Sequence, residues 1–150
     1  VAFDDEMKER VRKHQASRPK EWKTYEIYKD IYKIIKDISE KHQTVILDCI
    51  TLLVNNLMFT DGIDIDNASE EEINELEAYI QDQIKKLMEE VKKTDLYFVM
   101  VTNEIGLGVV PGYKLGRVYC DFVGRINQML GKLSDEVYFV VCGIPTKIKG

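Results

Sequence analysis

Short apolar runs rich in β-branched residues alternate along this chain with longer segments whose apolar residues recur every three or four positions. The runs at 44–48, 96–101 and 136–142 predict buried strands, and 24–27 is a shorter extended candidate. Helical spacing covers residues 4–16, 28–43, 50–59, 69–91 and 113–133. Strands that alternate with helices are typical of a parallel sheet with helices on both faces, so the sequence predicts a single α/β domain over residues 1–150.

A capping box marks the start of the longest predicted helix. Ser69 is followed by glutamates, so its hydroxyl and the Glu72 carboxylate can satisfy backbone N–H groups at a helix start. The apolar residues that follow form one stripe: Ile73, Leu76, Ile80, Ile84, Leu87 and Val91. The preceding segment 60–68 is rich in aspartate but fails the spacing of a calcium loop, so it is predicted to be a surface loop.

Composition argues against several classes of protein. The net charge of -5 disfavours binding to a nucleic acid backbone. No apolar run approaches the roughly 18 residues that a membrane span requires, and nothing resembles an export signal. Cys49, Cys120 and Cys142 lie far apart in apolar contexts, which predicts small core residues in a reducing compartment. We therefore expect a cytoplasmic protein.

Polar residues follow a predicted strand at the point where it ends. Thr102, Asn103 and Glu104 come directly after the run 96–101, and Gly106 and Gly108 follow. Ligands bind at the carboxyl ends of strands in open parallel sheets, so these three side chains are candidates for orienting a substrate or a phosphate. A helix cap and a turn are the alternative interpretation, because Asn and Gly follow many strands.

Asp48 ends another strand, in the sequence Val-Ile-Leu-Asp. This is the Walker B pattern, in which the acid holds Mg²⁺ through water in nucleotide-hydrolysing proteins. N-capping of the helix 50–59 by Asp48 is the alternative interpretation.

Five motifs occur in order between residue 4 and the end of the chain. The first comprises Asp4-Asp-Glu-Met7, Arg10-Val11, His14, Arg18-Pro19, Trp22, Thr24 and Glu26, and the second Leu47-Asp-Cys-Ile-Thr51 with Asn55-Asn-Leu57. The others are Thr102 to Pro111, Gly124-Arg-Ile-Asn-Gln128 and Ser134-Asp-Glu-Val137. Together they resemble the bifunctional adenosylcobinamide kinase and adenosylcobinamide-phosphate guanylyltransferase family of cobalamin biosynthesis.

This resemblance implies a three-layer P-loop NTPase fold of the RecA-like type. Members of the family open with a strand, a phosphate loop ending in Gly-Lys-Ser, a helix and a second strand. This sequence lacks that unit, which takes on the order of 30 residues. The loop's N–H groups and Lys would hold the β- and γ-phosphates. If the molecule begins at Val1, we expect no kinase activity and an incomplete sheet.

The resemblance makes His14 the catalytic nucleophile. In the family a His at this position attacks the α-phosphate of GTP, and GMP remains on an imidazole nitrogen. Attack requires neutral imidazole, and an ordinary His with a pKa near ~6.5 is largely neutral at cellular pH. The nearby cations that could offset phosphate charge are Arg10, Arg12, Lys13 and Arg18. From the residues alone, His14 shares a helical face with Met7 and Val11, so a packed helix residue is the alternative.

The resemblance also implies the remaining site and its ligands. Its GTP-binding residues are Gln15, Ala16, Ser17, Arg18, Glu26 and Asp48, with Mg²⁺ held by Asp48 through water. The substrates are adenosylcobinamide, adenosylcobinamide phosphate, GTP and ATP, and the family suggests a homo-oligomer, commonly a trimer. Arg125 and Asn127 lie on the predicted helix 113–133, where Arg125 is either an interface residue or a phosphate ligand.

Two other functions fit parts of the pattern. The chain could be a nucleotide-binding or assembly module without turnover, which the missing phosphate loop favours. It could also be a generic RecA-like NTPase, but that reading leaves the segment from His14 to Glu26 unexplained.

Overall fold

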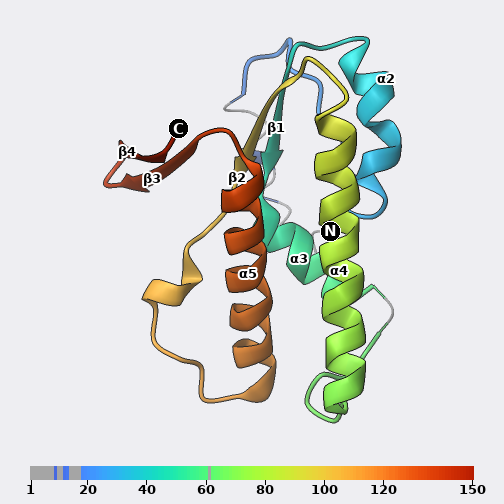
Figure 1. The fold of residues 1–150 in the computed structure, drawn as a ribbon, viewed down its shortest axis with the longest axis vertical. Coiled ribbons are helices and arrows are strands. Elements are labelled where there is room, and N and C mark those ends of the chain that lie inside the picture. The colour runs from blue at the N-terminus through green and yellow to red at the C-terminus, as the bar shows by residue number, and fades with distance from the viewer. Residues whose placement is uncertain (1–8, 10–11, 14–17, 61) are drawn as a thin grey trace.

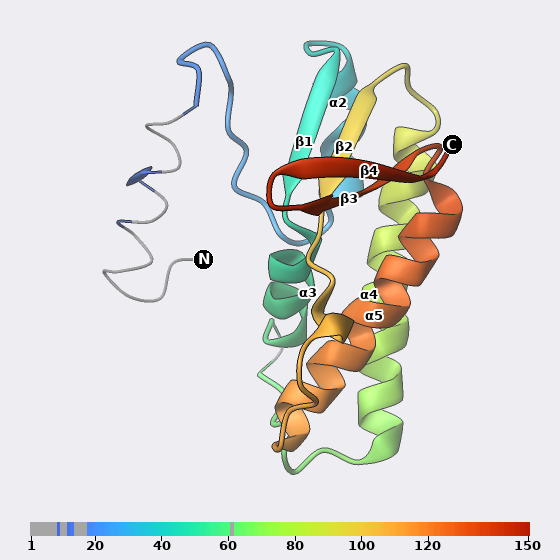
Figure 2. The same ribbon diagram turned by 90° about the vertical axis from the view of Figure 1, so that its left-hand side faces the viewer.

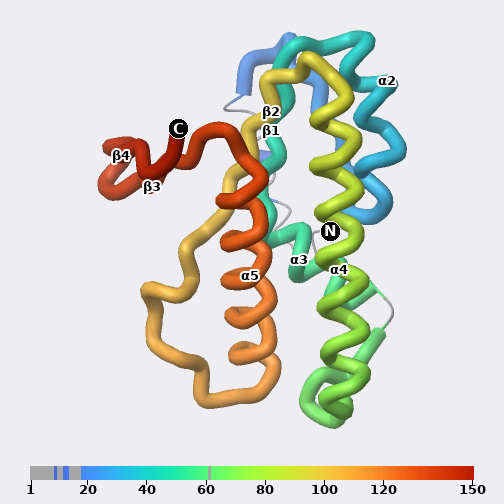
Figure 3. The backbone as a smooth tube through the Cα atoms, viewed as in Figure 1, coloured from blue at the N-terminus to red at the C-terminus, as the bar shows by residue number. Residues whose placement is uncertain are grey.

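The computed structural model describes residues 9, 12, 13, 18–60 and 62–150. In chain order the elements are η1 (Ile31–Ile34), α2 (Ile35–Ser39), β1 (Thr44–Asp48), α3 (Ile50–Met58), α4 (Glu70–Val91), β2 (Tyr97–Val101), η2 (Ile105–Leu107), α5 (Lys114–Leu133), β3 (Val137–Val141) and β4 (Ile144–Lys149). Helices α4 and α5 run along the long axis, with β1 and β2 near one end (Figure 1). Figure 3 traces the same path as a tube.

The strands β1 and β2 form a parallel two-stranded sheet, which confirms the α/β class and the parallel pairing. Asp48 lies opposite Val101 in the register, so both strands end at the same edge. The described helices cover one face of this pair, so the expected three-layer arrangement stays a prediction. One face packs on the helices through Leu47 and Met100, whereas Ile46 on the other is 46% exposed.

The main core lies where α3, α4 and α5 meet. Its most deeply buried side chains are Ile50, Val54, Leu57, Met58, Ile80, Ile84, Phe122, Val123 and Ile126. Full burial of one such side chain contributes roughly 1.5–3 kcal/mol, so this helical cluster is the main source of stability. A second cluster of Ile35, Leu87 and Val91 joins α2 to α4 beneath the sheet. In the described part of the chain, no helix is long and apolar enough to cross a membrane.

The predicted capping box at the start of α4 is confirmed. The Glu72 backbone N–H donates to Ser69 Oγ at 3.2 Å, and the Ser69 N–H donates to Glu72 Oε2 at 2.8 Å. Hydrogen bonding from the Ser69 backbone holds the pKa of the Glu72 carboxyl below its usual value. The loop before α4 is on the surface as expected, except that Ile65 is only 3% exposed and anchors it to the core.

The predicted strand 136–142 forms, but its predicted place in a buried parallel sheet is wrong. β3 pairs antiparallel with β4, and most of its side chains are exposed. Cys142 and Gly143 have φ of 53° and 76°, the left-handed pair that a two-residue hairpin turn requires. The hairpin extends from the end of α5 away from the helices (Figures 1 and 2). Cys142 is therefore exposed rather than in the core, while Cys49 and Cys120 are half-buried.

The segment before β1 is less regular than its spacing predicts. The predicted helix 28–43 is formed by η1 and α2, so it starts at Ile31 and ends at Ser39. Residues 24–27 form no strand. Of the predicted helix 4–16, residues 9, 12 and 13 are helical, and its other positions lie outside the described residues.

Replacing the capping serine tests how α4 begins. We expect Ser69→Ala to lower the free energy of unfolding by about 1 kcal/mol, because the Glu72 N–H loses its acceptor. Urea denaturation at neutral pH measures the change. A second variant, Glu72→Ala, removes the carboxylate of the box. Its matched control is Glu70→Ala, since each removes one acid from the first turn but only Glu72 belongs to the box.

The same box gives a pH dependence. Because the folded-state pKa of Glu72 is lowered, its contribution is present above the unfolded pKa and is lost as pH falls through the folded pKa. The difference between the wild type and Glu72→Ala should therefore shrink in acid. A difference that stays constant from neutral pH to acid would contradict this.

Candidate functional site

The register of the parallel sheet brings several predicted site residues to one edge. Asp48 closes β1 opposite Val101, and Thr102, Asn103 and Glu104 follow β2 directly. All four side chains therefore leave the sheet at its carboxyl edge, next to the start of α3. This juxtaposition is what an open parallel sheet offers a ligand.

Thr51 joins this edge to the protein interior. It is 4% exposed, and its Oγ1 accepts a hydrogen bond from Asn103 Nδ2 at 2.9 Å. Cys49 Sγ lies 3.0 Å from the same oxygen, and the Tyr119 hydroxyl donates to the Thr51 carbonyl at 3.0 Å. Burial raises the pKa of Tyr119. The Asn103 amide is thus engaged inward, and sequence reasoning missed Thr51 although it stands in one of the motifs.

Asn127 on α5 holds the same edge from the other side. The Thr102 hydroxyl donates to Asn127 Oδ1 at 2.7 Å, and Asn127 Nδ2 donates to the Asn103 carbonyl at 3.0 Å. One amide therefore satisfies a side chain and a backbone group of consecutive residues. Sequence reasoning placed Asn127 on this helix but gave it no role.

Glu104 is exposed, as Thr102 and Asn103 are, but its carboxylate also shapes the local backbone. Its Oε1 accepts the Gly106 N–H at 3.0 Å and caps η2. A Cβ on Gly106 would lie 2.9 Å from that oxygen, so the turn favours glycine there. The cap and turn interpretation of this segment is confirmed, and it coexists with an exposed carboxylate at the sheet edge.

Asp48 forms an ion pair with Arg18, with Oδ2 and the guanidinium nitrogen 3.2 Å apart. The side chains are 37% and 31% exposed, respectively. The alternative that Asp48 caps α3 is wrong, because Cys49 occupies the N-cap position and its side chain makes no cap hydrogen bond. Arg18, the last residue of the predicted GTP-binding run, is thus joined to the carboxyl edge of β1.

Asp48 also fits the predicted Mg²⁺ role in its chemistry. Magnesium keeps several waters and is commonly bound through one or two carboxylates plus substrate phosphates. Among the described residues there is no cluster of three His, Cys, Asp or Glu that could hold a metal. A single half-exposed carboxylate at a strand end is compatible with a nucleotide-borne Mg²⁺ and unlike a closed protein cage.

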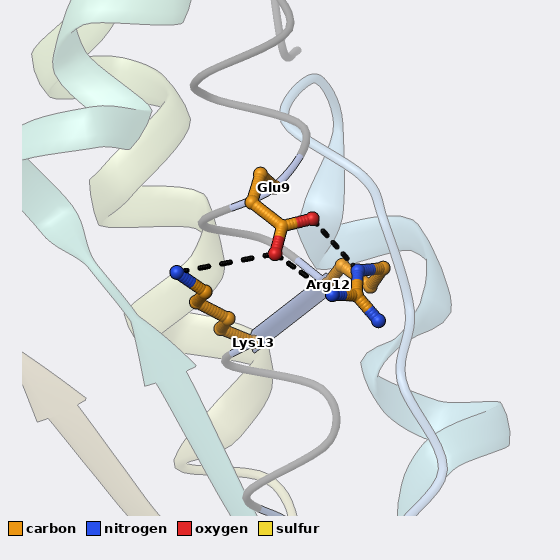
Figure 4. Close-up of polar contacts among 3 residues, drawn as sticks. All are labelled: Glu9, Arg12 and Lys13. Carbon is orange, nitrogen blue, oxygen red and sulfur yellow. Dashed lines mark hydrogen bonds and ion pairs between the residues drawn. The ribbon is translucent and has the colours of Figure 1, made fainter.

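His14, Gln15, Ala16 and Ser17 lie outside the described residues, as does the cation Arg10. Near them, Arg12 donates to both carboxylate oxygens of Glu9 at 2.8 and 2.7 Å, and Lys13 Nζ lies 3.9 Å from the same group (Figure 4). The Arg12 hydrogen bonds lower the pKa of Glu9. Glu9 thus engages two of the cations that were expected to offset phosphate charge.

Glu26 and Arg125 were also singled out from the sequence. Glu26 lies exposed in an irregular segment. Arg125 forms a two-pronged pair with Glu77, so it joins α5 to α4 within the molecule. A surface depression of about 530 Å³ lies near the amino ends of the strands, lined by Gln43 and Leu96 among others. It contains no predicted site residue, and the carboxyl edge remains the better candidate because it gathers the polar side chains.

The sequence matches a family model described as cobinamide kinase / cobinamide phosphate guanyltransferase over residues 1–148. The chain belongs to this family. The resemblance drawn from the five motifs is thereby confirmed.

Named relatives agree with this assignment. The bifunctional adenosylcobalamin biosynthesis proteins CobU of Escherichia coli and of Salmonella typhimurium are each 37% identical over 147 residues, covering 98% of this chain and 81% of the relative. CobP of Pseudomonas aeruginosa, which carries the same description, is 30% identical over 149 residues, covering 99% and 78%.

Removing the Thr51 hydroxyl tests the inner half of this network. Thr51→Val keeps the shape but removes the acceptor of the Asn103 amide, so we expect a loss of about 0.5–1.5 kcal/mol in the free energy of unfolding. Thr51→Ser keeps the hydroxyl and is the matched control. Equal losses in the two variants by urea denaturation would show that the hydroxyl contributes nothing.

Proposed function

We propose that this protein phosphorylates adenosylcobinamide and then transfers GMP from GTP onto the product, giving adenosylcobinamide-GDP. The observation that carries the proposal is the family match over residues 1–148, together with the relatives named for adenosylcobalamin biosynthesis. The polar carboxyl edge of β1 and β2 supports it, because it supplies carboxylate and hydroxyl groups where an α/β protein binds its ligands.

The guanylyl transfer proceeds in two displacements with His14 as the nucleophile. A neutral imidazole nitrogen attacks the α-phosphorus of GTP, the bond to the bridging oxygen breaks, and pyrophosphate leaves. A phosphate oxygen of adenosylcobinamide phosphate then attacks the same phosphorus, and the P–N bond breaks. One displacement between two anions becomes two steps, with a neutral imidazole as the attacking group in the first.

The guanine nucleotide is held by Gln15, Ala16, Ser17, Arg18, Glu26 and Asp48. Carboxylates can accept hydrogen bonds from guanine N–H groups or ribose hydroxyls, and a guanidinium can bind phosphate. The contact between Arg18 and Asp48 supports this grouping, because it joins the run after His14 to the sheet edge. Mg²⁺ bound with the nucleotide would be held by Asp48 through water and would offset the charge of the phosphates.

Phosphorylation of the aminopropanol hydroxyl uses ATP or GTP, with Thr102, Asn103 and Glu104 orienting the acceptor or the γ-phosphate. The inward engagement of Asn103 and the exposed position of Glu104 favour Glu104 as the group nearest to a ligand. We further propose that the protein works in the cytoplasm as a homo-oligomer, as the family suggests.

We also propose that the full sheet is the three-layer, RecA-like one of P-loop NTPases. The support is the exposed apolar face of the parallel pair, where Ile46 and Val101 are each more than 40% exposed. Labelling of Ile46→Cys with a thiol reagent tests this. Slow labelling relative to the exposed Cys142 supports a covering layer, and equally rapid labelling of the two thiols contradicts it.

The guanylyl intermediate gives the decisive test of the function. With α-labelled GTP and Mg²⁺, we expect the protein to take up a label that survives base and is lost in acid, as a phosphoramidate does. His14→Ala should take up none, because it lacks the attacking nitrogen. His42→Ala is the matched control, since it removes the other of the two histidines and should keep the label.

Two results would reject the proposal. Wild-type protein that never takes up label lacks the transferase chemistry, which favours a nucleotide-binding or assembly module. Equal labelling of the wild type and His14→Ala would place the GMP on another residue.

A further inference from the structure

Both polar atoms of the Asn127 side chain bond to the segment that follows β2. Its Oδ1 accepts from the Thr102 hydroxyl and its Nδ2 donates to the Asn103 carbonyl. These contacts join residues 24 and 25 positions apart in the sequence, from α5 to the sheet edge. An asparagine side chain offers an acceptor and a donor at fixed geometry, so it can hold a side chain and a backbone group at once.

The sequence of the segment that Asn127 holds would by itself allow the backbone many conformations. Residues 102–113 form a long connection with glycines at 106, 108 and 112, and only a short η2 within it. Glycine loses more conformational freedom than other residues when it is ordered. Fixing Thr102 and Asn103 at the start of this connection therefore determines the position of the backbone of the exposed Glu104.

Two helices share the task. Asn103 donates its side-chain amide to Thr51 on α3, while its carbonyl accepts from Asn127 on α5. Asn103 is thus held between the two helices by hydrogen bonds at opposite ends of the residue. Thr51 is buried, whereas Asn127 is half-buried, so Asn127 can be changed with less disturbance to the core.

We propose that Asn127 is a positioning residue that fixes Thr102 to Glu104 for the acceptor of the guanylyl group. This inference rests on the proposed function, in which that edge orients the acceptor for phosphorylation, and it extends the role of the edge to the phosphorylated acceptor of the second reaction. Asn127 acts through Thr102 and Asn103 and touches no reacting atom. Its loss should slow transfer from the protein to the acceptor and leave the attack on GTP unchanged, because a displacement of about 1 Å can cost on the order of 100-fold in rate.

The substitution Asn127→Asp separates the two hydrogen bonds with almost no change in shape. An ionised carboxylate still accepts from Thr102 but has no donor for the Asn103 carbonyl, and two acceptors then face one another. Protonation restores an O–H donor.

Single-turnover transfer tests the proposal. Protein labelled with α-labelled GTP is mixed with adenosylcobinamide phosphate, and the loss of label is followed at pH 5 to 8 where unfolding curves show folded protein. For Asn127→Asp we expect labelling by GTP at the wild-type rate and transfer slowed roughly 10- to 100-fold at neutral pH. The ratio of wild-type to variant transfer rates should fall as pH falls.

Two further variants complete the experiment. Asn127→Ala removes both hydrogen bonds without adding a charge, so its transfer should be slow with a ratio that does not change with pH. Asn74→Asp makes the same change of charge at an exposed position of α4 and should transfer at the wild-type rate.

The outcomes are distinct. A wild type that takes no label rejects the proposed function itself. A labelled wild type with Asn127→Asp transferring equally fast rejects the positioning role. Equal slowing of labelling and transfer in Asn127→Asp also rejects it, because a general structural defect affects both steps.

Discussion

The parallel register of β1 and β2 is the constraint on which the rest of this structure depends. It sets Asp48 opposite Val101, so the residues that follow the two strands emerge at the same edge. Alternate residues of a strand face opposite sides, and a slip of one position would turn Leu47 away from the core. Burial of Leu47 and Met100 against the helices therefore fixes the register, and the register fixes the site.

Once the edge is formed, its polar groups are satisfied mostly by one another. The Thr102 hydroxyl donates to Asn127 and the Asn103 amide donates to Thr51, so the hydroxyl proton and one amide proton are already engaged. A buried polar group left without a partner costs roughly 1–3 kcal/mol, and the Thr51 hydroxyl, which accepts from Asn103, is buried. The edge is consequently stabilised by the same hydrogen bonds that set its geometry, and the carboxylates of Asp48 and Glu104 are the groups best placed to reach a ligand.

Signals confined to a few neighbouring residues predicted the fold well, whereas pairings between distant residues were not predictable. The capping box at Ser69 and the stripe of α4 depend on residues three or four apart, and they were confirmed. The apolar composition of β3 is the same for a buried parallel strand and for an exposed hairpin, so composition could not decide its partner. A better indication of the hairpin is the pair Cys142-Gly143, because a two-residue turn needs positive φ and glycine adopts it readily. At the site, polar strand ends were predictable, but the inward direction of the Asn103 amide depends on Thr51, 52 positions away.

The pair between Arg18 and Asp48 explains how one edge can be ordered without a nucleotide and still accept one. Both side chains are about a third exposed, and ion pairs of this kind contribute at most about 1 kcal/mol because water and salt screen them. A nucleotide phosphate can bind the Arg18 guanidinium through charge-assisted hydrogen bonds worth more than that. In the proposed complex, the Arg18 guanidinium exchanges the Asp48 carboxylate for a nucleotide phosphate at little cost in free energy. The released Asp48 carboxylate is then available for a hydrated Mg²⁺ that arrives with the same phosphates.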